Sequence, residues 1–300
     1  MRNTAIKKQK TGFTPHPELK RRLDGLYKTY GSEYLASDPL YFPRLFKADK
    51  DREIAGLIAA SLAYGRVAQI KKSISSVLDI MDNEPYAFTM AFDPKRGQKL
   101  FSGFKHRFND SRDISCLIYY AKQMIKNSGS IGGFFKEGVL SKNEDMKASL
   151  SSFVKYTLTL DSEPIYGRKK LPEKAGVRFF FPSPEDGSPC KRLNLYLRWM
   201  IRKDDGLDFG IWKFIEPSKL IMPLDTHVAR ISRLLGLSKA PAASWRMAEE
   251  VTAALRTLDP RDPVKYDFSI CRLGILSECP SKRDVKKCGL CGIKDVCIVK

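Results

Sequence analysis

Apolar residues recur along most of the chain at the three- and four-residue spacing that is typical of amphipathic helices. The clearest stripe lies in residues 51–81, where Ile54, Leu57 and Ile58 begin a series that continues to Leu78. The same spacing predicts further helices over residues 113–126, 147–160, 190–202, 226–237 and 244–258. The sequence therefore predicts an all-α fold.

Prolines and glycines separate these stretches, as in NEPY, FDPKRG, FPSPEDGSP and LDPRDP. The pattern has no alternation of strands with crossover helices and no internal repeat. Apolar runs such as VRFFFP are the places where we expect short extended pieces. A basic arm opens the chain, and we assign it no element.

The net charge of the chain indicates which kind of molecule it binds. The 300 residues include 53 Lys and Arg against 34 Asp and Glu, a net charge of +19. Such an excess attracts polyanions and is typical of nucleic-acid-binding proteins, although a lysine-rich solvated surface is the alternative. Charge alone does not separate DNA from RNA or from an acidic membrane surface.

No run of 18 apolar residues is present, and the N-terminal MRNTAIKKQKTGF lacks the apolar core of a secretory signal. We therefore expect a cytoplasmic protein that does not enter a membrane, associated with the nucleoid if the source is a bacterium.

Four of the seven cysteines crowd the last 22 residues with the spacing C-x8-C-x2-C-x5-C. They are Cys279, Cys288, Cys291 and Cys297. In a reducing compartment such a cluster indicates metal ligation rather than disulfides. Four thiolates suit either an iron–sulfur cluster or zinc, and the spacing leaves both open.

A basic segment separates the first two of these cysteines. Its cationic residues are Lys282, Arg283, Lys286 and Lys287. A loop fixed by a metal would hold these charges against a phosphate backbone, since most contacts to nucleic acid go to phosphate. The alternative is that they only keep the loop solvated.

Two further segments carry candidate chemistry. PEDGSPCKRLNLYLRWMIR is a Gly/Pro turn that runs into a helix, whose N-terminus offers backbone N–H groups to a phosphate. Lys191 lies in the first turn, where the helix dipole and Arg192 disfavour its charged form and so favour a nucleophilic amine. The alternative is an ordinary surface lysine.

The second segment is PLDTHVARISRLLGL, in which Asp225 immediately precedes an apolar-periodic helix. The helix N-terminus would keep this carboxylate ionised, and a fixed carboxylate would stabilise an oxocarbenium-like transition state. The alternative is an Asp that only caps its helix.

The order of these parts resembles the helix-hairpin-helix DNA glycosylase superfamily, and its endonuclease III-like members most. The family's hairpin L-P-G-V-G-R-K-T-A-N is matched by Gly187, Lys191 and Asn194. Its V-D-T-H-x-x-R motif is matched by Asp225, Thr226, His227 and Arg230, and its cysteine motif by all four cysteines. The likeness spans roughly residues 50–297, and we identify the chain with a separate bacterial branch of the superfamily.

The chain also departs from the family pattern. Pro189 replaces the second hairpin glycine and has no N–H to donate, and Tyr64 replaces a glutamine of the first barrel helix. The separation from Lys191 to Asp225 is 225 − 191 = 34 residues, longer than in endonuclease III and closer to archaeal 8-oxoguanine glycosylases. The cysteine segment is two residues longer as well.

The resemblance implies a two-lobed fold. Residues 1–45 and 220–300 would form a terminal lobe holding a structural [4Fe–4S] cluster, with zinc as the alternative. Residues 46–219 would form a helical barrel ending in the hairpin. Duplex DNA containing a damaged base or abasic site would lie across the cleft, bound by a monomer.

The implied activity is that of a DNA glycosylase with abasic-site (AP) lyase action, removing a damaged base such as an oxidised one. Lys191 would be the nucleophile and Asp225 the stabilising carboxylate. Tyr64, Arg66 and Trp212 would line the base pocket or act as a wedge. The implied DNA-binding residues are Gly187, Arg192, Asn194, His227, Arg230, Lys282, Arg283, Lys286 and Lys287.

Three alternatives stay open. Asp225 would activate water if Lys191 is not placed for attack, which gives a glycosylase without lyase action. A protein that keeps the fold but only binds DNA or damaged DNA is the second alternative. An RNA-binding or RNA-processing protein is the third.

Overall fold

The computed structural model describes residues 13–14, 16–139, 145–276, 278–280 and 282–298, so most of the predicted basic arm lies outside the described residues. These described residues form an all-α fold, as predicted, and the one sheet among them consists of two strands of two residues each. The helices are α1 (Pro17–Thr29), α2 (Tyr41–Arg44), α3 (Asp49–Ser61), α4 (Val67–Ile80), α5 (Pro85–Ala91), α6 (Pro94–Leu100), α7 (Ser111–Ser128), α8 (Ile131–Val139), α9 (Met146–Thr157), α10 (Glu163–Tyr166), α11 (Lys191–Ile201), α12 (Thr226–Leu234), α13 (Trp245–Leu258), α14 (Asp267–Ile275) and α15 (Val285–Leu290). Strands β1 (Lys105–His106) and β2 (Asn109–Asp110) pair antiparallel.

Two local predictions need correction. The apolar stripe over residues 51–81 is not one helix, because α3 ends at Ser61 and α4 starts at Val67. Gly65 lies between them with φ +102°, a conformation that glycine adopts without strain, and the chain turns there. The run VRFFFP is not extended, since residues 176–180 form a 3-10 turn.

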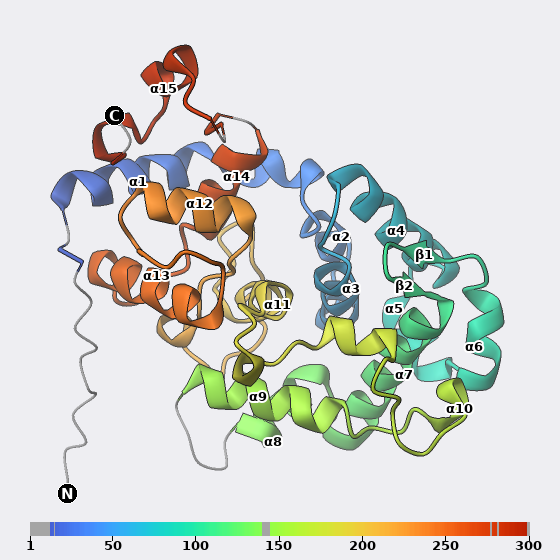
Figure 1. Ribbon diagram of the computed structural model, residues 1–300. Coiled ribbons are helices and arrows are strands. Elements are labelled where there is room, and N and C mark those ends of the chain that lie inside the picture. The colour runs from blue at the N-terminus through green and yellow to red at the C-terminus, as the bar shows by residue number, and fades with distance from the viewer. Residues whose placement is uncertain (1–12, 15, 140–144, 277, 281, 299–300) are drawn as a thin grey trace, which may run out of the picture.

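Helix α11 lies at the centre of the molecule, between two groups of helices (Figure 1). On one side α14 contacts both α1 and α12, and on the other α7 contacts α6 and α8. The division into lobes at residues 45 and 220 stays a prediction. Among the described residues, no helix combines the length and the apolar character needed to cross a membrane.

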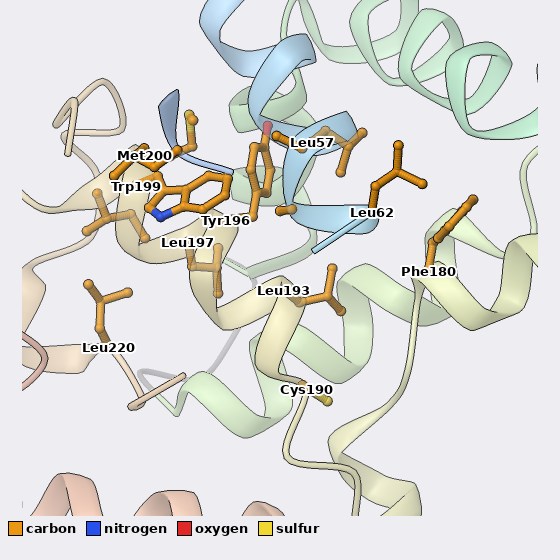
Figure 2. Close-up of a cluster of buried hydrophobic side chains, with 14 of the residues drawn as sticks. Leu57, Leu62, Phe180, Cys190, Leu193, Tyr196, Leu197, Trp199, Met200 and Leu220 are labelled. Carbon is orange, nitrogen blue, oxygen red and sulfur yellow. The ribbon is translucent and has the colours of Figure 1, made fainter. Parts of the chain in front are cut away.

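The core around α11 fixes its approach to α3. Helix α11 contributes the buried side chains of Tyr196, Trp199 and Met200 to the hydrophobic cluster drawn in Figure 2. A Cβ on Gly56 of α3 would lie 2.7 Å from Met200 Cε, so the absence of a side chain there allows the close approach. This packing holds the first turn of α11 beside the end of α3.

The first helix and the C-terminal segment hold each other. In α1, Leu19, Leu23 and Leu26 are buried, and the helix contacts α14. Asp24 accepts a hydrogen bond of 2.7 Å from Tyr266, and Arg22 pairs with Asp295 near the C-terminus. Tyr30, which caps the end of α1, donates to Glu278.

Candidate functional site

A cavity of about 400 Å³ brings the two predicted catalytic residues together. Its walls come from the α3–α4 turn, the starts of α11 and α12, helix α14 and residues 37–39. Lys191, Asp225, His227 and Tyr64 all line it, although they come from distant parts of the sequence. We call it the Lys191–Asp225 cavity.

Asp225 caps α12, as its position predicted. Its Oδ1 accepts a hydrogen bond of 2.8 Å from the backbone N–H of Val228. Its Oδ2 faces α14, where the Cys271 thiol donates to it over 3.7 Å. The carboxylate therefore has a partner at each oxygen while it lines the cavity.

Lys191 is the first residue of α11 and is half-buried. It follows Cys190, a non-glycine residue in the left-handed region (φ 46°), so the turn into the helix is strained. The Lys191 ammonium donates a hydrogen bond of 3.0 Å to the carbonyl of Ala63, at the end of the α3 segment. This bond fixes the side chain at the cavity wall.

A buried ion network lies behind the cavity. Arg198 donates to Asp208 (3.2 Å) and pairs with Asp267, and all three side chains are buried. Arg202 pairs with the same Asp208 and bonds Asp262 at 2.9 Å. Asp267 also lines the cavity. Burial raises the pKa of Asp267 to about 7, and the nearby Arg198 charge only partly opposes this shift.

The β1–β2 hairpin presents an aromatic side chain beside the cavity. Phe108, at its two-residue tip, is 65% exposed, and the Arg107 guanidinium lies 5.2 Å from its ring centre. Phe179, which is 40% exposed, packs edge-on against Phe108 at 5.7 Å and against Tyr64 at 4.9 Å. Exposed rings next to cations are suited to stacking on bases.

Tyr64 ties this hairpin to the cavity wall. Its phenol donates to the carbonyl of His106 (2.9 Å) and lies 2.5 Å from Asn109 Oδ1. Burial raises the pKa of Tyr64 to about 12, so the phenol keeps its proton at neutral pH. Asn109 in turn bonds Asp113 at 3.0 Å, which fixes the hairpin to the start of α7.

Residues 38–276 match the family described as Protein of unknown function (DUF2400). The chain belongs to this family. No curated protein matched, and neither did any solved structure. The DUF2400 segment contains the whole Lys191–Asp225 cavity except Ser37, and it ends before Cys279.

Within the DUF2400 segment, Trp212 does not occupy its predicted place. Its side chain is buried and packs on Phe135 and Phe214, and its indole N–H donates to Glu53. It lines a separate cavity of about 280 Å³ and not the Lys191–Asp225 cavity. The prediction of a base-pocket or wedge role for Trp212 is therefore wrong, because core packing holds the ring. Arg66, by contrast, is exposed at the start of α4.

Three of the predicted DNA-binding side chains are engaged within the protein. Arg192 is buried and donates to the carbonyls of Ser61 (3.1 Å) and Phe179. The buried Asn194 amide donates to the Pro189 carbonyl at 3.1 Å, which closes the turn before α11. These contacts correct both predictions, since neither side chain reaches the surface.

The third such residue, Arg230, anchors the cysteine segment. Its guanidinium donates to the Cys279 thiol sulfur at 3.2 Å and carbonyl at 2.5 Å, and to the Pro280 carbonyl at 2.9 Å. This is a positioning contact rather than a phosphate contact. Gly187 is exposed with φ +75°, and its carbonyl accepts from Trp245 N.

Residues 279–297, which we call the cysteine loop, follow the DUF2400 segment. Cys279, Cys288, Cys291 and Cys297 all line one cavity of about 720 Å³. Within the described part of the chain, no three His, Cys, Asp or Glu side chains are grouped closely enough to hold a metal ion. The predicted DNA-binding side chains of the loop, Lys282, Arg283, Lys286 and Lys287, are all exposed, and so is Lys294.

Sequence inspection missed the hairpin tip, the ion network and Cys271. The run KHRFND gives a weak signal for the tip, because Asp110 forms a capping box with Asp113 and so marks the start of α7 directly behind it. The ion network and the contact of Cys271 depend on which helices pack together in the fold, and no local sequence pattern marks this.

Proposed function

We propose that the protein is a DNA glycosylase with abasic-site lyase activity, acting on a damaged base that has been flipped out of the duplex. The observation that carries this proposal is the presence of Lys191 and Asp225 in one cavity, each at the N-terminal end of its own helix. An amine and a carboxylate facing one cavity are the two groups that the reaction needs.

In the proposed reaction, the free amine of Lys191 attacks C1′ of the flipped nucleotide. The Nζ–C1′ bond forms as the glycosidic C1′–N bond breaks, and the departing base takes up a proton. Loss of a proton from the amine and opening of the sugar ring give a Schiff base. Removal of a proton from C2′ then expels the 3′ phosphate and cuts the strand.

Asp225 would stabilise the positive charge that develops on the sugar and assist the proton transfers. Its cap bond to Val228 keeps the carboxylate at a fixed distance from the helix axis.

The hairpin tip supports the proposal energetically. Flipping a nucleotide costs a few kcal/mol of unstacking and unpairing. A base stacked on an aromatic side chain contributes roughly 1–3 kcal/mol. The exposed Phe108 and Phe179, with Arg107 beside them, would replace part of the lost stacking next to the cavity. They take the wedge role that the sequence had suggested for Trp212.

The cysteine loop would hold the proposed iron–sulfur cluster, with zinc as the alternative. A cavity lined by all four thiols leaves room for a multi-atom cluster held by Cys279, Cys288, Cys291 and Cys297. The cluster would order the basic loop against the DNA backbone and take no part in the reaction.

The test is borohydride trapping on duplexes that carry 8-oxoguanine, an oxidised pyrimidine, uracil or an abasic site. A covalent adduct that is lost in Lys191→Ala and kept in Lys213→Ala, an exposed lysine outside the cavity, would support the nucleophile. Full excision by Asp225→Asn would refute the role of the carboxylate. Alkali-labile sites without an adduct would indicate water activation centred on Asp225.

One observation favours a second candidate, a protein that binds damaged DNA without cutting it. The Lys191 ammonium donates a hydrogen bond to the Ala63 carbonyl, and this bond must break before the amine can attack C1′. Affinity for abasic DNA with neither an adduct nor a labile site on any duplex would favour that candidate.

A further inference from the structure

The Cys271 side chain lines the Lys191–Asp225 cavity but has no role in the reaction proposed above. It lies in the middle of α14 and lines the cavity, and its sulfur is 3.7 Å from Asp225 Oδ2. The other carboxylate oxygen accepts from Val228 N. A terminal carboxylate torsion is broad and two-fold, so one hydrogen bond alone leaves the carboxylate free to rotate.

We propose that Cys271 is a positioning residue for Asp225, whose thiol donates to Oδ2 and holds the carboxylate plane fixed toward the cavity. The inference rests on the proposed function of Asp225. It assigns a role to a side chain on a different helix from the catalytic pair.

The packing of α14 on α12 sets this contact. A Cβ on Gly274 would lie 2.5 Å from His227 Cβ, so the two helices approach as closely as a glycine allows. Gly274 is three residues after Cys271, nearly one helical turn along the same face. The thiol therefore has little freedom to move away from Asp225.

The surrounding charges keep the donor protonated. Besides Asp225 at the start of α12, the charged groups that act on the thiol are Asp267 on its own helix, Lys191 on α11 and Asp38. Burial, together with three carboxylates against one ammonium, holds the pKa of Cys271 well above its ordinary value. An S–H group can donate to the carboxylate, whereas a thiolate would repel it.

The first experiment does not depend on enzymatic activity. The intact protein is alkylated with iodoacetamide across a pH series, and the Cys271 peptide is followed by mass spectrometry in wild type and Asp225→Asn. Each unit by which the thiol pKa falls raises the thiolate fraction tenfold, and because a less basic thiolate is a weaker nucleophile the reaction becomes roughly three- to fourfold faster. The buried Cys116 in the same digest reports any general opening of the fold.

We expect Cys271 in Asp225→Asn to react roughly three- to fourfold faster than in wild type at the same pH, with Cys116 unchanged. Equal rates for Cys271 in the two proteins would overturn the proposal. Because this measurement needs no substrate, it decides the thiol–carboxylate contact even if the wild-type protein excises no base, a result that would reject the proposed function alone.

The second experiment reads the effect on Asp225 through the excision reaction. Loss of the donor leaves the carboxylate free to turn away from the developing charge, so the catalytic step should slow in Cys271→Ala while substrate binding is unchanged. We expect kcat to fall roughly two- to tenfold with KM unchanged, the usual range for one hydrogen bond. Cys271→Ser, which keeps a donor, should restore kcat.

Cys116→Ala is the control, because it removes a thiol that lies outside the cavity and should leave kcat unchanged. A kcat that does not fall in Cys271→Ala, or that falls equally in Cys271→Ala and Cys271→Ser, would show that the thiol only fills space.

Discussion

Arg198 and its partner Asp267 both line the Lys191–Asp225 cavity, and replacing Arg198 tests how much their ion pair contributes to the free energy of unfolding. Its side chain is 3% exposed and pairs with Asp208 and Asp267, which are 0% and 4% exposed. Arg198→Met keeps an unbranched stem and removes the charge. Asp208 retains Arg202, but Asp267 loses its ion-pair partner.

Breaking a buried ion pair by removing one partner costs about 3–5 kcal/mol, because the other charge is left without compensation. Asp267 can limit this loss by taking up a proton, since burial has already raised its pKa to about 7. Loss of Arg198 raises the pKa of Asp267 further, and each pH unit between that pKa and about 7 relieves about 1.4 kcal/mol, because below about 7 wild-type Asp267 is protonated too. We therefore expect a larger loss at pH 8 than at pH 5.5.

Urea unfolding at the two pH values measures both effects. Arg246→Met is the control, because Arg246 is 86% exposed and its pair with Glu250 should contribute less than about 1 kcal/mol. The reasoning fails if Arg198→Met lies within about 1 kcal/mol of wild type at pH 8. It also fails if the loss is the same at pH 5.5.

Three further perturbations follow from contacts described above. Gly274→Ala should destabilise the protein by roughly 1–3 kcal/mol, since its Cβ would overlap His227, and thermal unfolding against Gly289→Ala, where a Cβ meets nothing, would reveal it. Burial lowers the pKa of His106 below 6.5, so just below pH 6.5 the imidazole is protonated in the unfolded chain but neutral in the folded protein. Stability should fall as pH drops through about 6.5, and a His106→Gln protein whose pH dependence matches wild type would contradict this. For the cysteine loop we expect a brown protein with iron and acid-labile sulfide, and loss of colour in Cys288→Ser; a colourless wild type with stoichiometric zinc would reject the cluster.

The elements that the sequence predicted are those whose apolar period is long and uninterrupted. Helices α7, α9, α11, α12 and α13 lie close to their predicted ranges because each buries one continuous face. The break between α3 and α4 was missed because the apolar period continues through Gly65, so the positive φ there leaves no mark on the pattern. Helix α14 was missed because its residues are buried on most sides, which weakens any amphipathic signal.

The same distinction holds for the candidate site. The positions of Lys191 and Asp225 at the starts of helices were predicted because each follows a recognisable turn, whereas their chemical roles stay a prediction. Arg192 and Trp212 were misassigned because residue type indicates what a side chain can bind but not which partner is nearest. Arg192 meets backbone carbonyls and an aromatic ring within the protein, and Trp212 meets a buried carboxylate.

The contacts of α1 have a consequence for how the chain is made. Three of the polar partners of α1 and its cap, Tyr266, Glu278 and Asp295, follow it by 242, 248 and 273 residues along the chain. At a synthesis rate of about 5–20 residues per second, α1 leaves the ribosome roughly 12–55 seconds before they do. During that interval α14, which α1 contacts in the folded protein, has not been made, so Leu19, Leu23 and Leu26 are left without this partner. Transiently exposed apolar surface of this kind is prone to aggregation, which is what chaperones prevent. Of the described helices, α1 is thus the first to be synthesised and among the last to be packed.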